Sequence, residues 1–164
     1  MSDGHLRWAL MIAFAVGMLA APLGDLWRRR IPNAVVLALL ALYLAGLMAN
    51  AAPTTPMSGI TAAAITFAVT FGLYAFGVFG AGDAKLFSVA ALYSGLEGLA
   101  SFALATVLVG GLMALGVLMF RPRRVMRAMT ASGRASGERS GIPYGVAIAL
   151  GGIASAGLAG RFQF

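Results

Sequence analysis

The sequence predicts an all-α, polytopic integral membrane protein with about six transmembrane helices. Hydrophobic residues make up 60% of the 164 residues, charged residues make up only 10%, and the mean hydropathy is +0.90. These values are far from those of a soluble domain. The apolar residues also fall into runs close to the length of about 20 residues that a helix needs to cross a bilayer. We therefore expect one membrane-embedded domain, residues 1–164, with no soluble domain.

The spans are justified in chain order by the residues that interrupt the apolar runs. Three arginines at 28–30 end the first run, and Pro32 suits the first turn of the second helix. The fourth run is short, because Lys85 and Glu97 bracket it. The basic, Ser- and Gly-containing stretch 121–141 separates the last two runs. The expected spans are Leu6–Leu26, Ala34–Asn50, Ser58–Phe79, Ala84–Leu96, Leu99–Phe120 and Ile142–Leu158.

The distribution of basic residues gives these spans an orientation. If the turn around 28–33 is cytoplasmic, the turn at 80–85 and the stretch 121–141 are cytoplasmic too. That side then holds ten of the twelve Lys and Arg residues, and only Arg7 and Arg161 lie opposite. This asymmetry agrees with the positive-inside rule and predicts that both termini lie outside the cytoplasm.

The same composition excludes several classes of function. The formal net charge is +7, but the basic residues lie beside apolar segments, where they set topology, so we expect no nucleic-acid partner. The chain has no cysteine, which rules out disulfides, thiolate metal sites and a cysteine nucleophile. Its one histidine, His5, cannot form a metal site alone. We expect neither a metal nor a cofactor.

The first apolar run also has a second interpretation. Arg7 precedes it and the small residues Ala20 and Ala21 end it, which is the pattern of a cleaved signal peptide. Cleavage there would leave Asp25 near a new terminus.

Two acidic residues, Asp25 and Asp83, lie at the ends of long apolar segments. A carboxylate costs about 2.5–3.5 kcal/mol at the centre of a membrane helix, so an acid near the membrane is a candidate functional residue. The 58 residues between them accommodate two crossings and a turn, which returns the chain to the same face. Two carboxylates brought together there would share a proton. Such a pair suits peptide hydrolysis, with one acting as general base and the other polarising the scissile carbonyl.

The residues beside the two acids have physical roles as well. Gly80 and Gly82 allow the backbone to bend and to approach a neighbouring helix or an extended substrate. Pro32 pushes Ile31 toward an extended shape. Lys85 lies on a different helical face from Asp83, and we expect it to extend to the lipid headgroups rather than to pair with the acid.

These residues form two motifs that resemble a known family. Asp25 followed by basic residues and Ile31-Pro32-Asn33, together with Gly80-x-Gly82-Asp83-x-Lys85, is similar to the type IV prepilin peptidase family of membrane-embedded GxGD aspartyl proteases. The size resembles the short Tad/Flp-pilus branch (TadV/CpaA-like). The resemblance extends to Pro143-Tyr144-Gly145, which is similar to a Pro-aromatic-Gly element of the family's last helix.

The resemblance implies a specific activity. Such enzymes cleave the basic leader from prepilins and pseudopilins at the cytoplasmic face of the bacterial inner membrane. In that membrane, the multi-pass topology expected from the charge distribution would place both termini in the periplasm. By position, Asp25 and Asp83 would be catalytic, and Pro143, Tyr144 and Gly145 could line a substrate groove. The larger family members carry a cysteine-rich region and a methyltransferase activity. This chain has no cysteine and a short first loop, so no methyltransferase module is expected.

Two other classes remain open at this point. A small proton-coupled carrier could use the same two acids, although no inverted repeat is visible. A non-catalytic membrane scaffold of a pilus or secretion system would use the small residues only to pack helices and would leave the acids unexplained. Besides prepilins, the expected partners are membrane lipids, and the sequence does not define an oligomeric state.

Overall fold

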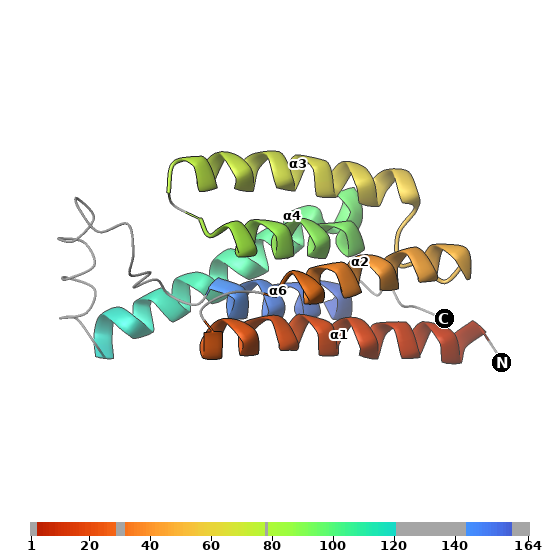
Figure 1. Cartoon of the computed structure of the whole chain (residues 1–164), viewed down its shortest axis with the longest axis horizontal. Coiled ribbons are helices and arrows are strands. Elements are labelled where there is room, and N and C mark those ends of the chain that lie inside the picture. The colour runs from red at the N-terminus through yellow and green to blue at the C-terminus, as the bar shows by residue number, and fades with distance from the viewer. Residues whose placement is uncertain (1–2, 29–31, 78, 121–143, 159–164) are drawn as a thin grey trace.

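The computed structural model contains helices and no strands in the residues that it describes, which are 3–28, 32–77, 79–120 and 144–158. At positions 3, 23–28, 117–118, 120, 144 and 156–158 it describes the backbone alone. The helices, drawn in Figure 1, are α1 (Asp3–Arg28), α2 (Asn33–Met48), α3 (Pro56–Ala75), α4 (Ala81–Phe120) and α6 (Tyr144–Leu158). The predicted all-α fold class is confirmed.

Three of these helices contain segments long and apolar enough to cross a membrane: Gly4–Pro22, Pro56–Ala75 and Ala81–Gly116. The helices Asn33–Met48 and Gly145–Ser155 are apolar but shorter. Large apolar side chains point outward; Phe76 is 85% exposed and Met48 is 87% exposed. A soluble protein would bury such side chains, whereas lipid accommodates them, so the structure is that of a membrane protein.

The predicted boundary between the fourth and fifth spans was wrong in detail. The sequence predicts separate spans ending at Leu96 and beginning at Leu99, but both fall within α4 and the break lies at Gly95. Gly95 has φ 60° and ψ 178°, a backbone conformation that is essentially restricted to glycine. Glu97 therefore follows the break inside a helix. Figure 1 shows the chain reversing direction there, so that the second half of α4 runs back along the bundle, opposite to the first half.

The backbone groups at this break have partners on the preceding segment. An uninterrupted helix would pair the Leu92 carbonyl with the Leu96 N–H. Instead, the Thr54 hydroxyl donates to the Leu92 oxygen at 3.0 Å, and the Leu96 N–H donates to the Ser58 hydroxyl oxygen at 2.9 Å. Backbone groups in a membrane protein must be satisfied internally, so this segment makes the Gly95 reversal possible.

Buried hydroxyl groups are satisfied in the same way. Thr66, Thr70, Ser88 and Thr106 each donate to a carbonyl one turn earlier in their own helix. Among the described side chains, no buried polar atom is without a hydrogen-bond partner. The interior therefore meets the requirement that a low-dielectric environment imposes on polar groups.

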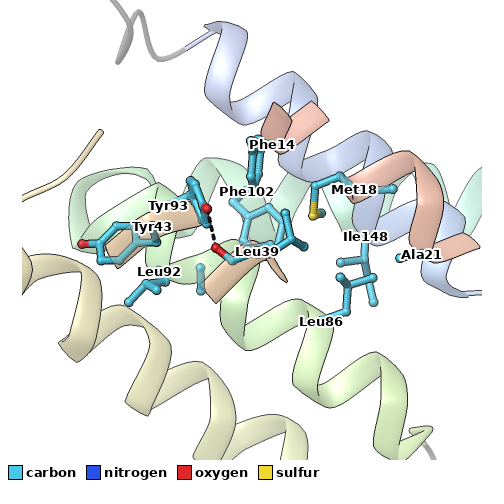
Figure 2. Packing of buried hydrophobic residues seen from close by; sticks show 13 residues of the cluster. Phe14, Met18, Ala21, Leu39, Tyr43, Leu86, Leu92, Tyr93, Phe102 and Ile148 are labelled. Atoms are coloured by element: carbon cyan, nitrogen blue, oxygen red, sulfur yellow. Dashed lines mark hydrogen bonds between the residues drawn. The ribbon is translucent and has the colours of Figure 1, made fainter. Parts of the chain in front are cut away.

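The core lies between α1, α2, α4 and α6, and α1 and the first half of α4 run in opposite directions (Figure 1). Phe14 on α1 stacks on Tyr93 of α4, with ring centroids 4.2 Å apart. One turn further along α1, Met18 lies level with Ala90, because both approach Gly152 of α6. An ideal Cβ at Gly152 would lie 2.9 Å from Met18 Cε and 3.8 Å from Ala90 Cβ. Figure 2 shows Phe14 and Met18 within this buried cluster.

Helix α2 is held between these two helices. The Tyr93 hydroxyl donates to the Leu39 carbonyl oxygen at 2.5 Å, a bond drawn in Figure 2. On the α1 side, an ideal Cβ at Gly17 would lie 2.7 Å from Leu39 Cδ2. Helix α6 packs as closely on the second half of α4, where an ideal Cβ at Gly151 would lie 2.9 Å from the backbone of Thr106. Glycines at these crossings let the helices approach each other.

Candidate active site

Asp83 lies in the first turn of α4 and is partly buried. The turn begins directly after Gly80, whose carbonyl oxygen accepts a hydrogen bond from the Ala84 N–H at 3.0 Å. A carboxylate in the first turn of a helix is stabilised by the positive end of the helix dipole, typically by about 0.3–1 kcal/mol at exposed sites. The helix start thus supplies a favourable electrostatic environment for an ionised acid.

Gly80 gives the Asp83 carboxylate the space that it occupies. An ideal Cβ at Gly80 would lie 2.7 Å from Asp83 Oδ2 and 3.5 Å from its carboxyl carbon. Gly80 does not have a positive φ, so its conformation alone does not require glycine. The requirement comes from the side chain of the acid three residues later. This is a more specific role than the backbone bending that the sequence predicts.

Lys85 connects the two sequence motifs. Its ammonium donates a hydrogen bond of 3.2 Å to Asn33 Oδ1, and both side chains are exposed. The sequence predicts a lysine that extends to the lipid headgroups, and it misses the amide partner 52 residues earlier. The bond brings the first residue of α2 next to the start of α4.

An aromatic contact holds the segment before Gly80 against the bundle. The ring of Phe79 meets Phe87 edge-on, with centroids 6.5 Å apart, and Phe87 lies against Phe102 at 4.6 Å. Phe102 is buried in the second half of α4. Sequence reasoning missed this contact, because an aromatic residue in an apolar chain carries no signal that separates it from lipid-facing positions.

Asp25 lies in the last turn of α1, where the structure describes the backbone alone. The end of α1 and the start of α4 lie at the same end of the bundle (Figure 1). This placement agrees with the predicted return of the chain to one face. Ile31, the first residue of the Ile-Pro-Asn motif, lies outside the described residues.

Pro32 is the N-cap residue of α2 rather than part of its first turn, which corrects the expectation from the sequence. Its φ of −63° and ψ of 129° are extended, and its carbonyl oxygen accepts a hydrogen bond from the Val35 N–H at 3.0 Å. Proline fits an N-cap because the residue needs no N–H donor there, and its restricted φ is compatible with extended backbone. The motif thus defines where α2 begins.

The remaining candidate residues are divided between α4 and α6. Gly82 lies in the first turn of α4, beside Asp83. Tyr144 is the first residue of α6, and Gly145, which follows it, is buried. Pro143 lies outside the described residues. The described part of the chain contains no group of three or more His, Cys, Asp or Glu residues that could hold a metal ion.

The fold and site define a polytopic helical membrane protein with an acid at a glycine-flanked helix start. A family model described as the type IV leader peptidase family matches residues 12–115, more than half of the chain. The chain belongs to this family and is therefore a membrane-embedded peptidase of the leader-peptidase type. The matched range contains Asp25 and Asp83 and ends before α6. Neither the curated proteins nor the solved structures gave a match.

Proposed function

We propose that this protein is an aspartic-type endopeptidase that removes the basic leader from Flp/Tad-type prepilins and pseudopilins, with Asp25 and Asp83 as its catalytic pair. Family membership supports prepilin cleavage in general. The observation that carries the catalytic assignment is the antiparallel course of α1 and the first half of α4, which meet at the stacked rings of Phe14 and Tyr93 and are both packed on α2 and α6.

The side chains at this contact define a register between α1 and α4, and this register can be extended along both helices toward Asp25 and Asp83. Phe14 contacts Tyr93, and Met18 lies level with Ala90 beside Gly152. Asp25 is seven residues after Met18, and Asp83 is seven residues before Ala90. Seven residues make about two helical turns, or about 10 Å, so the two acids lie about equally far from this level, with Pro22 inside that stretch of α1. The register therefore supports a similar depth for the two acids at one end of the bundle.

The proposed reaction needs one proton shared by two carboxyl groups. The ionised carboxylate takes a proton from water, which attacks the scissile carbonyl, while the protonated partner donates a hydrogen bond to the carbonyl oxygen. Collapse of the tetrahedral intermediate breaks the C–N bond, and the amine of the mature pilin leaves with a proton from the pair. Gly80 leaves room for the carboxylate of Asp83 during these steps.

The finer features of the proposal come from the distribution of charged residues. The basic residues at 28–30, 85 and 121–139 favour a cytoplasmic position for this end of the bundle in the bacterial inner membrane, with both termini periplasmic. We propose that residues 1–164 act as one peptidase domain without a methyltransferase module, and that Pro143, Tyr144 and Gly145 border the substrate.

The test is cleavage of a purified Flp-type prepilin by the purified protein in lipid vesicles. Wild-type protein should release the leader at one bond, as measured by mass spectrometry. Asp25→Asn and Asp83→Asn remove one ionisable group each with little change in shape, and each should lower the rate by at least about a thousandfold, because neither half of the pair works alone. Normal cleavage by either correctly inserted variant would refute the assignment of Asp25 and Asp83 as the catalytic pair, whereas failure of the wild-type protein to cleave would favour a carrier or a scaffold.

A further inference from the structure

We propose that the hydrogen bond between Lys85 and Asn33 positions Asp83 for catalysis by joining the start of α2 to the start of α4. The inference rests on the proposed function, because it assigns the two residues to the same peptidase site. Lys85 and Asn33 are positioning residues in this account, and neither contacts the scissile bond.

The bond lies where it can control the geometry of the acid pair. Lys85 is two residues after Asp83, within the first turns of α4, and its ammonium lies 3.2 Å from Asn33 Oδ1. Asn33 is the first residue of α2 and follows the end of α1 at Arg28 by five residues. The segments that carry the two acids are therefore connected through the chain on one side and through this hydrogen bond on the other.

A second hydrogen bond between α2 and α4 lies further from Asp83. The Tyr93 hydroxyl bonds to the Leu39 carbonyl, but Tyr93 is ten residues beyond Asp83, which is about 15 Å along the helix. The start of α4 also follows an exposed turn with a positive φ at Gly77. Displacements of a catalytic group near 1 Å can reduce a rate by about a hundredfold, so a small shift of this helix start would be measurable.

A double-mutant cycle on kcat for prepilin cleavage tests this role. Lys85→Met removes the donor and Asn33→Leu removes the acceptor, and each should lower kcat by roughly tenfold while KM changes by less than about twofold. The double variant should fall no further than either single variant, because both changes remove the same interaction. Lys85→Arg and Asn33→Asp keep a donor and an acceptor, respectively, and should stay within about threefold of wild type.

A matched control removes a hydrogen bond at the opposite end of the bundle. Tyr43→Phe removes the contact between the Tyr43 hydroxyl and Thr54 Oγ1, which measures 2.9 Å and lies near the Gly95 break. Its kcat should stay within about twofold of wild type, because the site is remote from Asp83. An equal loss of kcat in this control would mean that any lost contact slows the enzyme, and would overturn the proposal.

A distance measurement tests the link without relying on activity. The chain has no cysteine, so nitroxide labels on Leu37→Cys in α2 and Ala81→Cys in α4 report only this pair of helices. Lys85→Met and Asn33→Leu should each broaden the measured distance distribution, and Lys85→Arg should not. The proposal would be overturned if the distance distributions stayed unchanged. It would also be overturned if the two single effects on kcat multiplied to about a hundredfold in the double variant, or if the variants changed KM alone. Failure of wild-type protein to cleave prepilin would instead refute the proposed function, while the distances would still decide the link.

Discussion

Replacing Gly80 with alanine tests how the position of the Asp83 carboxylate affects catalysis, separately from any effect on the stability of the fold. The added Cβ would lie 2.7 Å from Asp83 Oδ2, whereas ordinary contacts begin at 3.4 Å, so the carboxylate must move by about 0.7 Å. The carboxylate is the end of a flexible side chain, and Gly80 has no positive φ, so the backbone can accept alanine. A shift of this size should lower kcat by roughly ten- to a hundredfold, because catalytic groups tolerate displacements of about 1 Å poorly.

The assay is single-turnover cleavage of prepilin in vesicles, with unfolding in detergent followed in parallel. Gly72→Ala in α3 is the matched control, because no atom outside its own helix backbone lies within 4 Å of its ideal Cβ. This control should cleave normally and unfold with up to about 1 kcal/mol more stability, as expected when alanine replaces a helical glycine. If correctly inserted Gly80→Ala cleaved at the wild-type rate, the close contact between Gly80 and Asp83 would have no part in catalysis.

Three further predictions concern the fold and the shared proton. Gly95→Ala should destabilise the protein by about 1–3 kcal/mol or prevent insertion, because its φ of 60° and ψ of 178° exclude other residues; a normal thermal midpoint in detergent would contradict the broken α4. Gly151→Ala should cost about 1–3 kcal/mol, because its Cβ would press on the Thr106 backbone, and the same melting assay measures this loss. Cleavage should follow a bell-shaped pH profile, since the active pair holds one proton: acid protonates both carboxyl groups and alkali ionises both. With chemistry rate-limiting, a flat profile from about pH 5 to pH 9 would be inconsistent with a pair.

The sequence predicted the class of fold and placed both acids beside helix ends, although α4 begins at Ala81 rather than at the predicted Ala84. Apolar runs indicated the helices, and the cost of placing a carboxylate near lipid singled out Asp25 and Asp83. The register between α1 and α4 needed the structure, because the apolar residues of both helices can face either lipid or protein. The contact of Phe14 with Tyr93 and that of Met18 with Gly152 of α6 identify the packed face of α1.

The features that the sequence could not predict depend on residues far apart in the chain. The hydrogen bond from Lys85 to Asn33 joins positions 52 residues apart, and a lysine near a membrane boundary ordinarily extends to the headgroups. The break at Gly95 depends on Thr54, which donates a hydrogen bond, and on Ser58, which accepts one, and both bonds form only after α3 has packed on α4. Gly95 itself is one of 22 glycines, so its identity alone did not locate the break.

The most direct test of the account is whether positions 25 and 83 meet. The wild-type chain has no cysteine, so a cross-link in Asp25→Cys/Asp83→Cys can join only these two positions. A disulfide requires Cα atoms within about 7 Å, and a methanethiosulfonate reagent with a one-carbon spacer reaches slightly further. The account predicts rapid cross-linking of this pair in vesicles and none in Asp25→Cys/Ser58→Cys, because Ser58 lies at the Gly95 end of the bundle. No cross-link between 25 and 83, or equal cross-linking in both pairs, would contradict a catalytic dyad.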